Sequence, residues 1–281
     1  MTENPTPKIS VVIPVYNEMA TIEEILLRVQ DVDLDKEIVI VDDGSRDGSR
    51  DLLQAIAESA KTAPAQIKLP RSGKVLATSR IRVFFQGKNQ GKGAALRRGF
   101  EESRGEIVII QDADLEYDPS DYHRLVAPII SGHADVVYGS RFLGGPHRVH
   151  LFWHYVGNKL LTSLSDMVTN LNLSDVWTCY KALRRNVLQG LDLKENRFGF
   201  EQEITIKIAR GGWPVYETPI SYYGRSYAEG KKITWKDGVR ALWCILRYGF
   251  FSGSVRAPRP PETKQETSLQ QQGIRQPGIK G

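Results

Sequence analysis

The chain has 281 residues, of which 41% are hydrophobic and 25% charged, and this composition is typical of a globular domain. The net charge of +5 suits anionic ligands such as diphosphates or a lipid headgroup. No dense basic stripe appears in the sequence, which argues against nucleic-acid binding. The two cysteines, Cys179 and Cys244, lack zinc-binding or disulfide-framework spacing, so a reducing compartment is expected.

No apolar run in the sequence approaches the roughly 20 residues needed to cross a bilayer. Residues 1–8 are polar and lack the pattern of a signal peptide. We therefore expect a cytoplasmic protein. Peripheral contact with the cytoplasmic face of a membrane stays open, because such contact needs no spanning segment.

Strand and helix patterns alternate over the first 140 residues. Continuous apolar runs predict buried strands at Ile9–Val15, Glu37–Val41, Ile81–Phe85, Ile107–Ile110 and Ala134–Tyr138. Helical patterns lie between them at Thr21–Gln30, Asp47–Ser59, Gly91–Ser103 and Pro119–Ser131. Because strands that alternate with such helices are joined by right-handed crossovers, the sequence predicts an α/β fold around a parallel, doubly wound sheet.

The rest of the chain is less regular. Residues 60–80 are rich in Lys, Ala, Pro and Ser and predict an exposed loop insertion without a function. The second half predicts helices at Trp153–Leu173, Gly199–Arg210 and Trp235–Phe251, and a strand within Pro214–Tyr223. From residue 255 to 281 the chain is rich in Pro, Gln and Gly with few apolar residues, which predicts a disordered tail.

Three carboxylates follow the strand predicted at Ile107–Ile110: Asp112, Asp114 and Glu116. Ligands of open α/β sheets bind beyond the carboxyl ends of the strands. In extended backbone alternate side chains share a face, so these carboxylates are expected to point the same way and to need a cation between them. Oxygen ligands favour Mg²⁺ or Mn²⁺. The alternative is an exposed acidic turn that caps the helix starting near Pro119.

Polar residues also follow the first two strands. After the first strand, Tyr16 could stack on a nucleobase, and after the second, Asp43 could accept a hydrogen bond from a base N–H. The alternative for Asp42-Asp43-Gly44-Ser45 is a turn followed by a helix N-cap, and both interpretations hold if Asp47 caps the helix while Asp43 reads the base. The segment Gln90–Gly93 opens another helix, whose N-terminus favours anions, but its spacing is not that of a P-loop or a dinucleotide fingerprint.

Taken in order, these motifs resemble the family 2 glycosyltransferases of the GT-A fold, and most of all the polyprenyl-phosphate sugar synthases, which include the dolichol-phosphate mannosyltransferases. The resemblance runs from about Ile9 to Phe250. Its most specific strings are Val12-Ile13-Pro14-Val15-Tyr16-Asn17-Glu18, Val41-Asp42-Asp43-Gly44-Ser45, Asp112-Ala113-Asp114, Gly139-Ser140-Arg141, and Pro219-Ile220 followed by Arg225 and Lys231. One such string alone would be weak, but the ordered set is specific.

The resemblance implies a Rossmann-like domain over residues 1–254, with a mostly parallel central sheet and flanking helices. Residues 8–145 would be its nucleotide-binding half and residues 146–254 its acceptor-binding half. Matched positions place five residues around the nucleoside: Pro14, Tyr16, Glu18, Val41 and Asp43. The ribose, the diphosphate and the metal would be contacted by Asp112, Ala113 and Asp114. Glu116 would be a further metal ligand. Three more contact the donor sugar or phosphates: Arg141, Arg225 and Lys231.

The resemblance further implies inverting transfer from a nucleotide-diphosphate sugar, GDP-mannose or UDP-glucose, to a polyprenyl or dolichyl phosphate. Such a phosphate needs no catalytic base, whereas a hydroxyl acceptor does, and Glu201 stands about where hydroxyl-acceptor relatives keep one. The chain departs from the family pattern over Asp175–Lys181, which leaves mannose in question. The helix at Trp235–Phe251 fits a membrane-interfacial helix or a core helix with a basic outer face.

Overall fold

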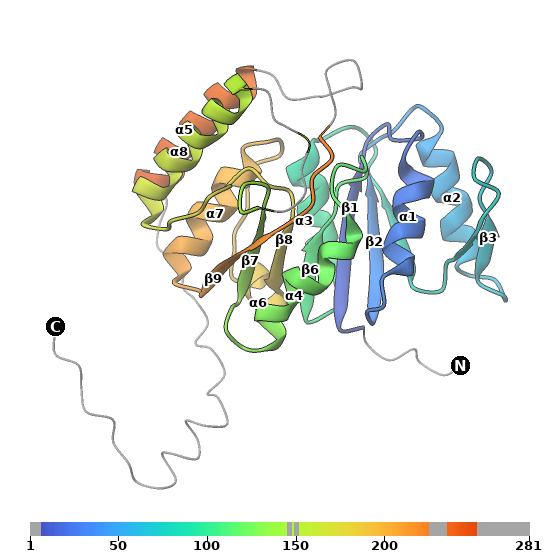
Figure 1. Cartoon of the computed structure of the whole chain (residues 1–281). Helices are drawn as coiled ribbons and strands as arrows, with labels where there is room; N and C mark the ends of the chain where they lie inside the picture. Colours follow the sequence, from blue (N-terminus) through green and yellow to red (C-terminus); the bar gives the residue numbers. More distant parts are fainter. Residues whose placement is uncertain (1–6, 145–147, 149–151, 225–234, 252–281) are drawn as a thin grey trace, which may run out of the picture.

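The computed structural model describes residues 7–144, 148, 152–224 and 235–251 (Figure 1). Its centre is a sheet of seven strands in the order β5-β2-β1-β6-β8-β7-β9. The bounds of these strands are, in chain order, β1 Ile9–Val15, β2 Lys36–Asp42, β5 Ile81–Phe85, β6 Ile107–Ile110, β7 Val136–Ser140, β8 Lys181–Arg184 and β9 Val215–Pro219.

Only β8 runs against the other strands of this sheet: it pairs antiparallel with both β6 and β7, while the remaining neighbours pair parallel. The apolar runs of β1, β2 and β6 are almost wholly buried, as expected for strands covered on both faces. The predicted Rossmann-like fold with a mostly parallel sheet is confirmed.

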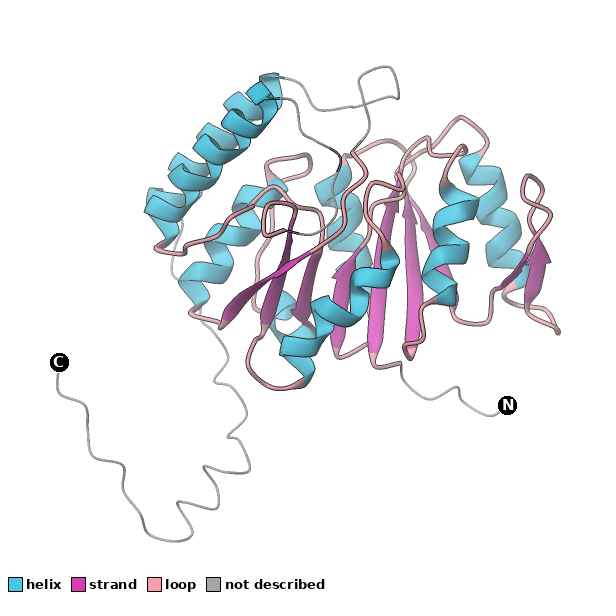
Figure 2. Ribbon diagram, in the orientation of Figure 1, coloured by secondary structure: helices cyan, strands magenta, loops and turns pink. Residues whose placement is uncertain are grey.

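Helices cover the sheet on both faces (Figure 2). Helix α3 packs on β1 and β2, while α4 lies on the opposite face against β6, β7 and β8. The helix bounds are α1 Ile22–Asp31, α2 Ser49–Ser59, α3 Lys92–Glu102, α4 Tyr122–Ile130, α5 Phe152–Thr169, α6 Arg185–Gln189, α7 Phe200–Gly211 and α8 Trp235–Phe251, and a short 3-10 helix spans Pro119–Asp121. The alternation of strands and helices therefore agrees with the sequence over the first half of the chain.

The structure of residues 60–80 differs from the predicted exposed loop. It forms a two-stranded antiparallel hairpin, β3 (Gln66–Lys68) and β4 (Val75–Ala77), instead of an irregular loop. Leu69 and Leu76 are buried and belong to the main hydrophobic core. Two isolated apolar residues in a polar stretch carry little periodicity, so the sequence pattern missed strands that only packing against α1 and α2 stabilises.

The second half differs from prediction in two places. Helix α5 ends at Thr169, four residues before the predicted Leu173, because Asn170 adopts a left-handed conformation with φ of 56°. Strand β8 and helix α6 were not predicted, since each is only four or five residues long. Helix α8 has the predicted bounds, and the predicted tail at 255–281 lies outside the described residues.

Helices α5 and α8 lie side by side, away from the central sheet, and α7 joins them to it (Figure 1). They expose large apolar side chains, among them Phe152, Trp153, Val156, Leu160 and Met167 on α5 and Val239, Leu242, Trp243, Leu246, Phe250 and Phe251 on α8. We call these residues the apolar α5/α8 surface. Across the described residues, no helix has both the length and the hydropathy required of a membrane span.

Candidate active site

The register of the sheet gathers the predicted motifs at one edge. Pro14 on β1 is paired with Val41 on β2, and Val12 is paired with Ile110 at the end of β6. The backbone N–H of Gln111 then donates to the carbonyl of Val12 at 2.9 Å. The carboxyl ends of β2, β1 and β6 are consecutive, so the segments that follow them form one continuous rim.

The segments after β1 and β2 are fastened to each other. The hydroxyl of Ser45 accepts a hydrogen bond from the backbone N–H of Asn17 at 3.0 Å, and that of Ser49 accepts one from Glu18 at 3.0 Å. In return, the backbone N–H of Arg46 donates to Oδ1 of Asn17 at 2.8 Å. Both loops are therefore held in place before any ligand arrives.

The five residues predicted around a nucleoside differ in accessibility. Tyr16 is 38% exposed and available to stack on a base, and Pro14 and Glu18 are half-buried. Val41 is fully buried and Asp43 is 3% exposed. The structure thus brings all five to adjacent strand ends, and Tyr16 is the member most open to a ligand.

Asp43 has a second role that the sequence did not reveal. Its two carboxylate oxygens accept hydrogen bonds from the backbone N–H groups of Gln90 and Gly91, both at 2.7 Å. Burial raises the pKa of Asp43 above its usual value, although these two bonds act in the opposite direction. Asp43 therefore anchors the start of α3 to β2. The predicted capping role of Asp47 is wrong, because the N-cap of α2 is Gly48 and has no side-chain cap. Oδ1 of Asp47 still accepts the backbone N–H of Ser49, the first residue of α2, at 3.0 Å.

The carboxylates after β6 do not lie in extended backbone, so the predicted alternation of their side chains is wrong. The strand ends at Ile110 and the chain turns at once, with Leu115 in a left-handed conformation of φ 64°. Oδ1 of Asp114 accepts the backbone N–H of Glu116 at 3.2 Å, which closes the turn. The cap of the following 3-10 helix is Asp118, outside the three carboxylates.

The base of this turn is held by Gln111, which is fully buried. Its side-chain oxygen accepts from the hydroxyls of Tyr122 at 2.7 Å and Tyr180 at 2.6 Å, and its amide nitrogen donates to the carbonyl of Asp112 at 2.9 Å. Such a satisfied buried network fixes the backbone from which Asp112 projects.

Glu116 points toward the segment after β9. The hydroxyl of Tyr222 donates to Oε2 of Glu116 at 2.9 Å, and the backbone N–H of Tyr223 donates to its carbonyl at 2.8 Å. The segment after β9 therefore runs beside the turn after β6. Arg225 and Lys231, predicted to contact phosphates, lie outside the described residues.

A chain of alternating charges leads inward from Asp112. The ammonium of Lys92 lies 2.8 Å from Oδ1 and 2.9 Å from Oδ2 of Asp112, and 3.7 Å from Oε1 of Glu201. The other oxygen of Glu201 bonds the ammonium of the fully buried Lys181. Burial acts to lower the pKa of Lys92, but the charge of Asp112 raises it well above its usual value. Lys92 is therefore cationic at neutral pH.

The donor set suits a hard divalent cation. Asp112 and Asp114 offer carboxylate oxygens on the turn, Ala113 between them is buried, and oxygen donors favour Mg²⁺ or Mn²⁺. Among the residues that the structure describes, no three His, Cys, Asp or Glu side chains are grouped as a metal site. The three-carboxylate cluster expected from the strand pattern is not formed, so a metal here would need further oxygens, from water or from a diphosphate.

Arg141, at the end of β7, is 8% exposed and held by the fully buried Asp175. Its Nε donates to Oδ2 of Asp175 at 2.7 Å and its Nη2 donates to Oδ1 at 2.8 Å. The guanidinium also lies over the ring of Tyr222, 5.1 Å from the centroid. This two-point pairing fixes the orientation of Arg141 at the same edge as the turn after β6.

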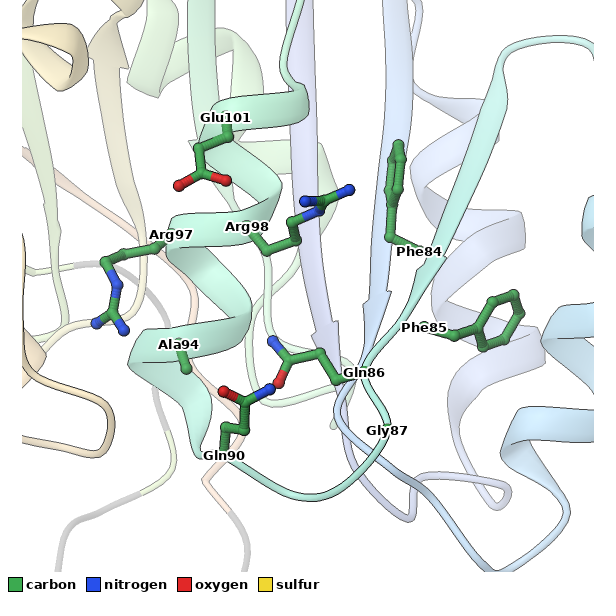
Figure 3. Close-up of a pocket in the computed structure, with 9 residues that line it drawn as sticks. All are labelled: Phe84, Phe85, Gln86, Gly87, Gln90, Ala94, Arg97, Arg98 and Glu101. Carbon is green, nitrogen blue, oxygen red and sulfur yellow. The ribbon is translucent and has the colours of Figure 1, made fainter.

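An open hollow of about 520 Å³ lies beside the rim, between the end of β5 and α3 (Figure 3). Its lining is mostly polar, with Gln86 and Gln90 turned toward each other across it. Arg97 points the other way, and its guanidinium donates to the carbonyl of Glu195 at 2.6 Å. Neither Asp112 nor Asp114 is among the residues that line this hollow.

The sequence matches the known family described as "Glycosyl transferase family 2" over residues 10–191. The chain belongs to this family. Over 237 residues it is 33% identical to the undecaprenyl-phosphate 4-deoxy-4-formamido-L-arabinose transferase of Pseudomonas aeruginosa (strain LESB58), which covers 82% of this chain and 62% of that protein. It therefore spans less than two thirds of that relative.

Two further family 2 relatives are similar. The chain is 29% identical over 232 residues to the dolichol-phosphate mannosyltransferase of Pyrococcus furiosus, covering 80% of this chain and 59% of that protein. It is also 29% identical over 237 residues to the polyprenol monophosphomannose synthase of Mycolicibacterium smegmatis, covering 82% and 83%. Among solved structures, the glucosyl-3-phosphoglycerate synthase of Mycobacterium tuberculosis with Mn²⁺ and UDP superposes with a TM-score of 0.61 at 20% identity, over 88% of this chain and 82% of that chain. This likeness supports the GT-A fold.

Three residues at this family 2 site had no predicted role: Lys92, Asp175 and Lys181. Lys92 stands between two glycines, and the only sequence signal near it was the expected preference of this helix N-terminus for anions. Asp175 and Lys181 bound the stretch that departs from the family pattern. Their ion pairs join residues 34 and 20 positions apart, which no local pattern reports.

Proposed function

We propose that this family 2 protein transfers a sugar from a nucleotide-diphosphate donor to a polyprenyl or dolichyl phosphate. The observation that carries the proposal is the rim itself. The end of β1 with Tyr16, the end of β2 with Asp43 and the turn with Asp112 are adjacent there, as the base, the ribose and the diphosphate are adjacent in the donor. Support also comes from relatives named for undecaprenyl, dolichol and polyprenol phosphates.

The proposed roles follow the position of each side chain. Tyr16 would stack on the base, and Asp112 and Asp114 would hold a Mg²⁺ or Mn²⁺, which would supply positive charge to the diphosphate leaving group. Arg141, fixed by Asp175, presents its guanidinium to the donor sugar or to the acceptor phosphate. Arg225 and Lys231 stay assigned to phosphate contacts by the family pattern alone.

The donor is proposed to be GDP-mannose or UDP-glucose. Nucleoside diphosphates distinguish them, because a ligand that binds only the native state raises the melting temperature by mass action. We expect GDP or UDP with Mn²⁺ to raise Tm by several degrees more than ADP or CDP. An equal response to all four would contradict a nucleoside-specific rim, and donor hydrolysis would then identify the sugar.

The alternative acceptor is a hydroxyl, with Glu201 as the base. Contacts of Glu201 argue against that role, because one of its oxygens bonds Lys181 and the other faces Lys92 at 3.7 Å. At saturating Mn²⁺ we expect Glu201→Gln to lower kcat by less than about a hundredfold, below the usual loss of a general base. A thousandfold loss with a normal KM would favour the hydroxyl acceptor.

A lipid acceptor requires the protein to reach a membrane, and we propose that the apolar α5/α8 surface makes that peripheral contact. Trp243 is 52% exposed and Phe250 is 66% exposed, and tryptophan is favoured at membrane interfaces. We expect the Trp243→Glu/Phe250→Glu variant to stop floating with vesicles of phosphatidylcholine and phosphatidylglycerol. Ile130→Glu, at a 67% exposed position on α4, is the matched control and should float normally.

A further inference from the structure

The ammonium group of Lys92 lies close to two carboxylates. Its Nζ lies within 2.9 Å of both oxygens of Asp112 and only 3.7 Å from Oε1 of Glu201. The side chains of Lys92 and Asp112 are 20% and 18% exposed, whereas that of Glu201 is 5% exposed. The ammonium therefore sits at the boundary between the ligand-facing rim and a buried carboxylate, within one short movement of either.

The backbones that carry these groups cannot separate easily. A Cβ added to Gly91 would lie 2.3 Å from the carbonyl oxygen of Asn196, and one added to Gly93 would lie 2.2 Å from that of Glu195. The N–H of Ala94 also donates to the carbonyl of Asn196 at 3.2 Å. The first turn of α3 is thus pressed against the segment that enters α7, so any change of partner by Lys92 is a movement of its side chain.

The position of the ammonium conflicts with a metal ion. A hard divalent cation binds a carboxylate oxygen at about 2.0–2.6 Å, and the ammonium of Lys92 already lies against both oxygens of Asp112. Two cations cannot share that carboxylate without strong repulsion. Oε1 of Glu201 is the nearby acceptor to which the ammonium can move without entering water.

We propose that Lys92 is an exchangeable cation that competes with the divalent ion for Asp112 and transfers to Glu201 when the ion binds. The inference rests on the proposed function, because it takes Asp112 as a metal ligand. It makes Lys92 a positioning residue: it keeps Asp112 paired before the metal arrives and leaves the carboxylate to the metal afterwards. Glu201 is the receiving site, with its second oxygen held by Lys181.

If Lys92 moves between the two carboxylates, the variants Lys92→Met and Glu201→Gln should have opposite effects on Mn²⁺ affinity. Lys92→Met removes the competitor, so Mn²⁺ binding without nucleotide should tighten by about fivefold to tenfold. Glu201→Gln removes the receiving charge, so Lys92 stays on Asp112 and Mn²⁺ binding should weaken by about fivefold. In the Lys92→Met background the same Glu201→Gln change should have little effect, because no ammonium remains to be received.

The test is a titration of free Mn²⁺ by electron paramagnetic resonance for the wild type, the two single variants and the double variant. Lys88→Met is the matched control, since Lys88 is an exposed lysine of the loop that leads into α3, and its Mn²⁺ affinity should equal that of the wild type. General structural damage would weaken binding, so tighter binding by Lys92→Met cannot come from damage.

Two results would overturn the inference while leaving the proposed function in place: unchanged or weaker Mn²⁺ binding by Lys92→Met, or an equal Glu201→Gln effect in both backgrounds. The second result would mean simple attraction of the ion by Glu201. Should Lys92→Met fail to fold, Lys92→Gln replaces it in the cycle. Absence of Mn²⁺ binding by the wild type, with and without a nucleoside diphosphate, would reject both the inference and the proposed metal site.

Discussion

Two regions at the carboxyl edge of the sheet, the start of α3 and the end of β7, each hold a buried or half-buried cation, and they hold it in different ways. At the start of α3, the ammonium of Lys92 bonds Asp112 and lies 3.7 Å from a second carboxylate, Glu201. At the end of β7, the guanidinium of Arg141 makes two parallel bonds with Asp175, whose side chain is fully buried.

The difference follows from the chemistry of the two side chains. A guanidinium is a planar fork that matches one carboxylate, and it loses both bonds if it turns away. An ammonium is a point charge on a flexible stem, and it can move between acceptors at little cost in geometry. The ion pair of Arg141 with Asp175 is therefore expected to stay intact, and we call it the closed pair. The ion pair of Lys92 with Asp112 is expected to break when the divalent ion binds, and we call it the open pair.

The largest expected effect is on the closed pair. Asp175→Asn leaves the guanidinium of Arg141 buried without a counter-charge, which typically costs about 3–5 kcal/mol of unfolding free energy. Urea unfolding measures this. The control is Asp192→Asn, because Asp192 pairs with Lys194 at an 80% exposed position and should change stability by no more than about 0.5 kcal/mol. A loss of unfolding free energy below 1 kcal/mol for Asp175→Asn would mean that the ion pair with Asp175 does not hold Arg141 in place.

The next effect concerns the packing that sets the place of Lys92. Gly93→Ala puts a Cβ against the backbone of Glu195, and overpacking of this kind costs about 1–3 kcal/mol. Gly87→Ala in the preceding loop is the control, since nothing lies within 4 Å of its added Cβ. Thermal unfolding of both variants gives the difference. Equal melting temperatures would show that α3 and the segment entering α7 are free to move apart.

A smaller change in stability is expected for the open pair. Asp112→Asn removes the partner of Lys92, but Glu201 is within reach of the ammonium, so the unfolding free energy should fall by only about 1 kcal/mol. Sugar transfer should nevertheless be lost by about a thousandfold or more, since a metal ligand is gone. A stability loss as large as that of Asp175→Asn would erase the contrast between the two pairs.

The smallest effect concerns Asp166 on α5, a carboxylate that hydrogen-bonds the backbone N–H of Leu173 at 3.2 Å. Burial raises the pKa of Asp166 to about 6 from its usual 3.8. A raised native pKa favours folding at low pH, and that contribution is lost as the pH rises from about 4 to about 6. After allowance for solvent exposure it is on the order of 1 kcal/mol. Asp166→Asn should abolish this part of the pH dependence in urea titrations at pH 4.5 and 7.

Much of the fold was predictable because its core strands are short apolar runs bounded by turns. Ile107–Ile110 was predicted residue for residue, since four consecutive aliphatic residues between polar segments are typical of a buried strand. The hairpin at 66–77 escaped prediction because its stability comes from contacts of Leu69 and Leu76 with the core. Strand β8 escaped because its pairing with β6 and β7 joins distant segments.

The site, like the fold, was predictable only where the signal is local in the sequence. Asp43 and Asp112 were found from the order of motifs along the chain, but their partners were not. The bonds of Asp43 to Gln90 and Gly91, and of Asp112 to Lys92, span 47, 48 and 20 residues. The alternating face expected for Asp112, Asp114 and Glu116 was wrong because the strand ends at Ile110, before the first of these carboxylates.

By itself, the sequence determined the α/β class, the strand ends that carry polar residues and the acidic segment at the rim, because these depend on local periodicity and on residue type. Tertiary structure alone decided which charges meet: Lys92 with Asp112 and Glu201, and Arg141 with Asp175. Ion pairs depend on distances of a few ångström between residues far apart in the chain, and only the packed sheet and its helices set those distances.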